Sequence, residues 1–125
     1  PDMRLPIQQA LTHPDRMPSP ASPLDLVSVG ALTFDAPDLE RFPCLALSYE
    51  AIAAGGTAPA VLNAANEVGV YAFLDERIGF MDVPGIVRRS LDERPNGTGD
   101  DLEAIFEADR WARERASALV EEIRR

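Results

Sequence analysis

The sequence predicts a mainly α-helical protein: a four-helix-bundle-like C-terminal domain preceded by an extended, proline-rich linker with one or two short strands. Apolar residues recur at helical spacing from residue 43 to the end of the chain. Glycine and proline divide this part into four segments of helical length. Prolines crowd residues 13–43, where they exclude a helix because each one fixes φ and removes a backbone donor.

The proline-rich stretch contains the strand candidate. Between Leu24 and Phe34, apolar residues alternate with small or polar ones, which is the period of a strand. A lone hairpin is marginal in water, and the chain offers few other strands. We therefore expect this segment to join a sheet outside the chain, rather than to pair with itself as a bent ribbon.

Two helices are predicted next. The first begins at Pro43, a favoured first-turn residue, and ends at Gly55-Gly56, where a left-handed stop is permitted. Thr57 is expected to cap the second helix, which would run to Gly79. The inward residues would be Leu45, Tyr49, Ile52 and Ala53 in the first helix and Val61, Leu62, Ala65, Val68, Ala72 and Phe73 in the second.

Two more helices complete the prediction. The third runs from Val83 or Pro84 to Glu93 with Asp82 as its cap, and turn residues 94–99 follow it. The fourth begins after Asp100, which with Glu103 resembles a capping box. Because four amphipathic helices joined by short loops cannot bury their stripes separately, we expect them to pack together as a bundle. The stripe of the fourth helix is Leu102, Ile105, Phe106, Ala112, Ala116, Leu119, Val120 and Ile123.

Composition excludes several classes of partner. The 125 residues suit one domain, and the net charge of −9 repels nucleic acid and anionic membranes alike. No apolar run is long enough to span a bilayer. The single cysteine, Cys44, lies between Pro43 and Leu45 and is expected to be a small buried hydrophobe rather than a reactive thiol. This usage fits a reducing compartment, so we expect a cytoplasmic protein.

No catalytic, cofactor or metal site is predicted. His13 is the only histidine, and with one cysteine it cannot supply the ligands of a zinc site. The Gly55-Gly56-Thr57 turn lacks the spacing and the lysine of a phosphate-binding loop, so we interpret it as a plain turn between helices. No glycine-rich dinucleotide fingerprint follows a strand.

One polar face is unusual for a helix. Asn63, Asn66 and Glu67 lie at positions i, i+3 and i+4 of the second predicted helix, although Asn is a mediocre residue in a helix interior. These side chains would either contact a ligand or form a polar network that fixes how a neighbouring segment docks. We favour the structural interpretation, because no nucleophile or base accompanies them.

The charged residues are otherwise expected on solvated faces, including residues 75–77 and 113–115. Asp109 is the exception, because it falls near the inner edge of the fourth stripe. A carboxylate there requires a partner, and an arginine such as Arg41 or Arg88 is a candidate.

Several short motifs along the chain occur together. They are Pro1-Asp2-Met3-Arg4 with Pro6-Ile7, Leu24-Asp25, Ala31-Leu32-Thr33-Phe34, Ala36-Pro37-Asp38, Arg41-Phe42-Pro43-Cys44-Leu45, Leu62-Asn63-Ala64-Ala65-Asn66-Glu67 and Ala72-Phe73-Leu74. In this order and at this spacing they resemble the family of 1-deoxy-D-xylulose 5-phosphate reductoisomerase. The resemblance is strongest from Pro1 to Leu74, and beyond Ile78 only the helical pattern agrees.

The resemblance implies a homodimeric enzyme of three parts: an NADPH-binding domain, a catalytic domain and a C-terminal four-helix bundle. Such enzymes convert 1-deoxy-D-xylulose 5-phosphate to 2-C-methyl-D-erythritol 4-phosphate in non-mevalonate isoprenoid synthesis. They use NADPH and Mg²⁺, Mn²⁺ or Co²⁺. By resemblance, residues 1–12 would end the catalytic domain, 13–38 would be the linker and 39–125 the bundle.

The same resemblance implies that the metal-binding acids, the phosphate-binding serines and an Asn–Lys pair precede Pro1, and this sequence contains no lysine. Only Pro1 and Met3 match positions that line the substrate pocket, as apolar contacts. We expect a supporting fragment that is inactive alone, binds neither NADPH nor metal, and has the rest of the same enzyme as its partner. The alternative is an independent helical interaction module that adds its strand to a partner's sheet.

Overall fold

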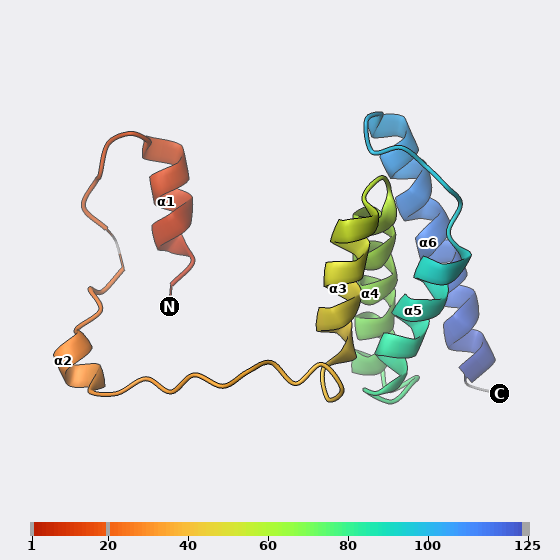
Figure 1. Cartoon of the computed structure of the whole chain (residues 1–125), viewed down its shortest axis with the longest axis horizontal. Coiled ribbons are helices and arrows are strands. Elements are labelled where there is room, and N and C mark those ends of the chain that lie inside the picture. The colour runs from red at the N-terminus through yellow and green to blue at the C-terminus, as the bar shows by residue number, and fades with distance from the viewer. Residues whose placement is uncertain (1, 20, 124–125) are drawn as a thin grey trace. The chain divides into compact units, whose positions relative to one another are not determined.

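The computed structural model describes residues 2–19 and 21–123, which form six α-helices in two compact units (Figure 1). The unit of residues 1–36 contains α1 (Arg4–Thr12) and α2 (Leu26–Val29). The unit of residues 37–125, called the helical domain below, contains α3 (Pro43–Ala54), α4 (Ala58–Leu74), α5 (Asp82–Glu93) and α6 (Leu102–Ile123). The predicted mainly helical class is confirmed.

The predicted strand between Leu24 and Phe34 is replaced in part by the one-turn helix α2, and the described part of the chain contains no strand. The Asp25 carboxylate explains the turn, because it accepts hydrogen bonds from the amide of Val27 at 3.0 Å and from the hydroxyl of Ser28. This is the geometry of an N-cap, which favours a helical turn over an extended segment.

The core of the helical domain forms around α4, which packs against α3, α5 and α6. These four helices lie side by side in Figure 1, and α3 and α6 do not contact each other along their described lengths. A regular four-helix bundle stays a prediction. The core residues are Leu47 and Ala51 of α3, Ala58, Val61, Ala64, Ala65 and Ala72 of α4, Val83, Ile86, Val87 and Leu91 of α5, Ala112, Ala116, Leu119 and Val120 of α6, and Ile78.

The predicted inward face of α3 is wrong. Leu47 and Ala51 are buried, whereas Tyr49 and Ile52 expose 64% and 71% of their surface, and Leu45 and Ala53 are also exposed. The helix is apolar on both faces, so periodicity alone does not decide which face meets α4.

The end of α4 also differs from the prediction, because the helix stops at Leu74 rather than at Gly79. Glu76 adopts a positive φ of 56°. Its amide donates to the carbonyl of Phe73 at 3.0 Å, and the amide of Arg77 donates to the carbonyl of Ala72 at 2.9 Å. These two bonds define a Schellman motif, here built on a non-glycine residue.

Three predicted caps are displaced or altered. Thr57 occupies the N-cap position of α4, but with φ −87° and ψ −1° its side chain makes no capping bond. Asp82 is the first residue of α5, and its carboxylate accepts from the amide of Gly79 at 2.7 Å. At the start of α6 the carboxylate of Asp101, rather than that of Asp100, accepts from the amide of Glu103 at 3.1 Å.

The α3–α4 turn packs against the loop between α5 and α6. Gly56 has a φ of +56°, and a Cβ built on it would overlap the carbonyl oxygen of Gly97. Gly99 is also tight, because its Cβ would lie 2.9 Å from the carbonyl oxygen of Gly56. The two loops therefore touch through backbone atoms, which only glycine permits at this distance.

We predict that Gly56→Ala lowers the free energy of unfolding by about 2 kcal/mol or more, because it adds left-handed strain and a backbone overlap. Gly85→Ala is the matched control, since Gly85 lies in α5 with no atom within 4 Å of its built Cβ. It should be neutral or should stabilise by up to about 1 kcal/mol. Urea unfolding followed by circular dichroism measures both, and equal midpoints for the two variants would disprove the close loop contact.

Candidate functional site

Two of the three polar residues predicted to share a face form a network between α4 and α6. The Asn63 amide donates to Glu67 at 3.3 Å, and the Arg113 guanidinium donates to the other Glu67 oxygen at 2.8 Å. Arg113 also forms bonds of 2.8 and 3.1 Å to Asp109. The partner of Asp109 is therefore Arg113, not the predicted Arg41 or Arg88.

The hydrogen bond to Asp109 and, to a smaller extent, the one to Glu67 raise the pKa of the Arg113 guanidinium. Arg113 was predicted on a solvated face, but it links two helices. The spacing of four residues between Asp109 and Arg113 is a signal that the sequence contains. The bond between Arg113 and Glu67, 46 residues apart, has no local signal.

The third polar residue, Asn66, lies apart from this network. It is half-buried, and its side-chain amide has no hydrogen bond within the described residues. It lines an open apolar groove of about 340 Å³ at the end of the helical domain where α3 starts and α4 ends. The groove is lined by Arg41, Phe42, Pro43, Cys44, Asn66, Val70, Phe73, Leu74, Phe80, Met81, Val83 and Pro84.

Aromatic side chains shape this groove. The rings of Phe73 and Phe80 meet edge to face with their centroids 5.6 Å apart. The Arg41 guanidinium lies 5.7 Å from the centroid of the Phe42 ring, within cation–π distance. Sequence reasoning did not identify the groove, because Phe80 and Met81 belong to a loop outside any helical stripe.

Cys44 also lines the groove and is half-buried rather than fully buried as predicted. Burial raises the pKa of the Cys44 thiol, so the thiolate is scarce at neutral pH. The side chain is accessible to a small reagent but is not an activated nucleophile.

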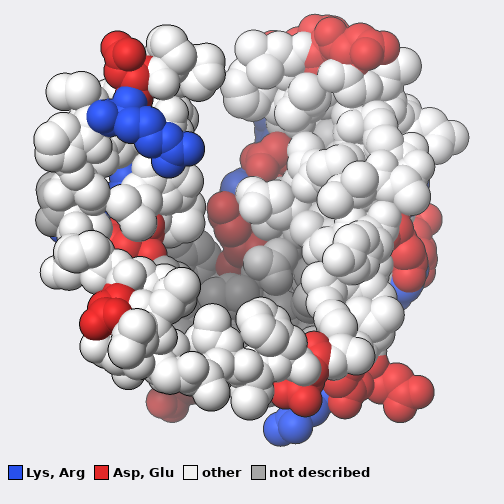
Figure 2. Space-filling model, turned by 60° about the vertical axis from the view of Figure 1, so that its left-hand side comes forward, with Lys and Arg blue, Asp and Glu red and all other residues white. Residues whose placement is uncertain are grey.

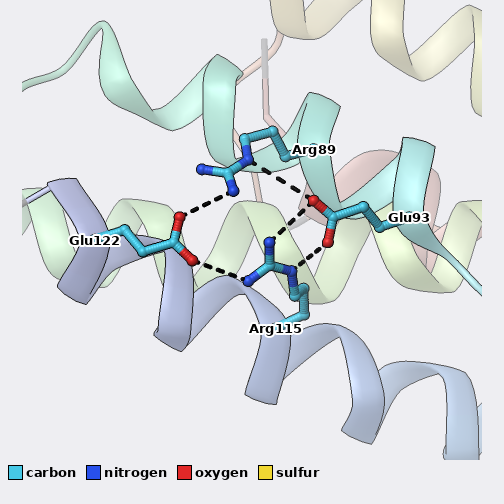
Figure 3. A network of polar contacts seen from close by, with 4 residues as sticks. All are labelled: Arg89, Glu93, Arg115 and Glu122. Carbon is cyan, nitrogen blue, oxygen red and sulfur yellow. Dashed lines mark hydrogen bonds and ion pairs between the residues drawn. The ribbon is translucent and has the colours of Figure 1, made fainter.

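On the other side of the domain, four charged residues join α5 to α6 (Figure 3). Arg115 bonds to both oxygens of Glu93 and lies 3.2 Å from Glu122. Arg89 lies 2.9 Å from Glu122 and 3.8 Å from Glu93. Each cation therefore bridges both anions, and Arg115, predicted to be solvated, exposes only 23% of its side chain.

The network lowers the pKa values of its two carboxyl groups. The hydrogen bond from Arg115 holds the pKa of Glu93 below its ordinary value of 4.5. Hydrogen bonds from Arg89 and then Arg115 do the same to the pKa of Glu122. Between α3 and α5, the Arg88 guanidinium bonds to both oxygens of Glu50 at 2.6 and 2.9 Å and lowers the pKa of Glu50 as well.

The remaining predicted residues lie as follows. Met3 is at the N-cap position of α1 with 71% of its surface exposed, and Pro1 lies outside the described residues. His13 is exposed directly after α1. Within residues 2–19 and 21–123, no group of three His, Cys, Asp or Glu side chains is placed to hold a metal ion. None of the described helices combines the length and apolar character that crossing a membrane requires.

Comparison with known proteins gives a consistent family. Residues 1–115 match the family described as the DXP reductoisomerase C-terminal domain. Over 123 residues, or 98% of this chain, the sequence is 53% identical to 1-deoxy-D-xylulose 5-phosphate reductoisomerase of Cupriavidus pinatubonensis and 54% identical to that of Acetivibrio thermocellus. The chain spans 31% of the length of each of these relatives.

Solved structures agree with this result. The reductoisomerase from Zymomonas mobilis in complex with NADPH is 50% identical, with a TM-score of 0.86 over 97% of this chain and 32% of that chain. A DOX-P reductoisomerase in complex with NADPH, fosmidomycin and magnesium is 40% identical, with a TM-score of 0.85 over 97% of this chain and 32% of that chain.

The fold and these matches define the class of the chain, which corresponds to the C-terminal part of larger reductoisomerases. The chain belongs to the DXP reductoisomerase C-terminal domain family, as the resemblance of its motifs predicted.

The charge network generates a prediction on pH. Because the pKa values of Glu50, Glu93 and Glu122 are lower in the folded state than the ordinary 4.5, their contribution to stability is present above that pH. It is lost as the pH falls through the lower folded values. The midpoint of thermal unfolding should therefore fall with acidification below about pH 4.5.

Removing one arginine of the network should weaken the dependence of thermal stability on pH. We expect Arg115→Gln to be less stable than the wild type at neutral pH and to lose less stability on acidification. Arg110→Gln should follow the wild-type curve, because Arg110 lies on the same helix and has no ion pair with the described residues. Thermal unfolding at constant ionic strength measures all three proteins, and parallel curves for wild type and Arg115→Gln would disprove the prediction.

Proposed function

We propose that this chain is the supporting C-terminal third of a 1-deoxy-D-xylulose 5-phosphate reductoisomerase. The parent enzyme, meaning the full-length polypeptide that contains this chain as its C-terminal part, would convert 1-deoxy-D-xylulose 5-phosphate to 2-C-methyl-D-erythritol 4-phosphate. It would use NADPH and Mg²⁺, Mn²⁺ or Co²⁺ and act in the cytoplasm as a homodimer in non-mevalonate isoprenoid synthesis. The observation that carries the proposal is a match over 98% of this chain but only 31% of its relatives.

The division of labour within the parent follows from the family resemblance. Residues 1–12 would end the catalytic domain, residues 13–38 would link it to the bundle of residues 39–125, and the groups that bind NADPH and metal would precede this chain. The sequence contains no lysine, so it cannot supply the Asn–Lys pair of the family. Pro1 and Met3 would line the substrate pocket by apolar contact only.

The helical domain would act mechanically. The Asn63, Asn66 and Glu67 side chains would brace elements of the catalytic domain, since the geometry of a site depends on the residues that hold it in place. Asn66 supports this role, because its side-chain amide has no hydrogen bond within the described residues. The Asn63–Glu67–Arg113 network fixes α4, which carries Asn66, against α6. An independent interaction module is not favoured, because α2 occupies part of the segment that would have paired with a partner's sheet.

The proposal predicts different behaviour for the fragment and the parent. The purified 125-residue chain should neither oxidise NADPH with 1-deoxy-D-xylulose 5-phosphate and Mg²⁺ nor change NADPH fluorescence on titration. The parent enzyme should do both. Absorbance at the NADPH band measures the turnover, and substrate-dependent oxidation by the fragment, or its absence in the parent, would contradict the proposal.

A further inference from the structure

Ion pairs and exposed apolar side chains are unevenly distributed over the surface of the helical domain. The exposed positions of α5 and α6 carry most of the arginine–carboxylate pairs, whereas the end of α4 and the loop after it expose large apolar side chains. Tyr71, Leu74, Phe80 and Met81 each expose between 60% and 65% of their surface. On the helical domain, at the right of Figure 2, uncharged side chains cover much of the face turned to the viewer, with carboxylates at its edges. Contiguous apolar surface of this kind marks an interaction site.

The groove described above forms the concave part of this apolar surface. It combines exposed aromatic walls with two polar side chains, Asn66 and Arg41, that form no hydrogen bond or ion pair within the described residues. The Asn66 amide can donate and accept a hydrogen bond at once, which matches the amide and carbonyl of a peptide group. The Arg41 guanidinium makes no ion pair with the described residues and suits a carboxylate at the rim.

The covalent path of the chain favours one occupant. Arg41, Phe42 and Pro43 line the groove and are also the residues through which the polypeptide enters α3. The relatives that this chain matches are about three times longer, and the match is to their C-terminal part, so their other segments precede this entry point. A tethered segment has an effective concentration in the millimolar range, far above that of a free partner.

A second copy of the chain is a weaker candidate. Each copy carries a net charge of −9, so two copies repel each other wherever salt does not screen their charges.

We propose that this groove is the docking site for a segment of the preceding two thirds of the same enzyme. The segment inserts an apolar side chain beside Phe73 and Phe80, bonds one peptide group to the Asn66 amide, and places a carboxylate near Arg41. This proposal rests on the proposed function. It assigns the contact between the helical domain and the catalytic part to an apolar groove, with Asn66 as its polar anchor.

Cys44 offers a direct probe, because it lines the groove and is the only cysteine in the chain. The rate of Cys44 alkylation by iodoacetamide is measured by peptide mass spectrometry in the 125-residue chain and in the parent enzyme. The proposal predicts alkylation slower by about tenfold or more in the parent, because the docked segment must leave before the reagent enters.

Matched variants test whether the protection of Cys44 from alkylation depends on the groove. In the parent, Phe80→Ser should raise the Cys44 rate towards that of the isolated chain. Phe106→Ser should leave the protection intact, because Phe106 is an exposed phenylalanine of α6 outside the groove. Met81→Ser is a second groove variant that replaces Phe80→Ser if the latter alters the circular dichroism spectrum.

Three outcomes would overturn the proposal. The first is equal alkylation of Cys44 in chain and parent, and the second is the same response to the groove variants and to Phe106→Ser. The third is protection of the isolated chain that grows with its concentration, which would identify a second copy as the occupant. If the wild-type parent turns over with NADPH but its Cys44 is alkylated as fast as in the isolated chain, only the docking proposal is wrong. A parent without turnover would disprove the proposed function.

Discussion

The close packing of α4 against its neighbours is the constraint on which the helical domain depends. The positions of α4 that meet the other helices are mostly alanine, with Gly69 opposite Val83 of α5, and Ala112 and Ala116 line the facing side of α6. A Cβ at Gly69 would lie 3.1 Å from Val83 Cγ1. Small residues let the helix axes approach, and an interior packed to this density does not accept extra methylene groups without strain.

The buried positions of α4 are filled by small residues, and large side chains of the helix lie on the outside. Several large side chains of α3 and α4 lie exposed outside the core, namely Tyr49, Ile52, Tyr71 and Leu74. The opposite side is held by ion pairs between exposed helix faces, such as those of Arg115, which add orientation more than stability. The domain therefore combines ion-paired helix faces suited to water with an apolar end suited to a protein neighbour, which fits the proposed supporting role.

The sequence predicted the helices well but not their contacts. Pro43, the Gly55-Gly56 turn and the turn residues 94–99 marked the boundaries because their backbone preferences are local. The end of α4 was missed, since nothing local indicates that Glu76 adopts a left-handed conformation.

The inward face of α3 was missed because an all-round apolar helix contains no directional signal. The family was predictable because its motifs keep their order and spacing along the chain. The groove was not, because it joins residues from Arg41 to Pro84 that only the folded chain brings together.

The proposed role of the helical domain is to support the parent enzyme through its close packing, without contact to NADPH. It is tested most directly by Ala116→Leu in the parent enzyme, with Ala118→Leu as control, since Ala116 is fully buried and Ala118 is exposed on the same helix. Overpacking at Ala116 should cost about 1–3 kcal/mol and lower the temperature at which turnover is lost. The KM for NADPH measured well below that temperature should not change. A raised KM for NADPH in Ala116→Leu, or the same inactivation temperature for both variants, would contradict the account.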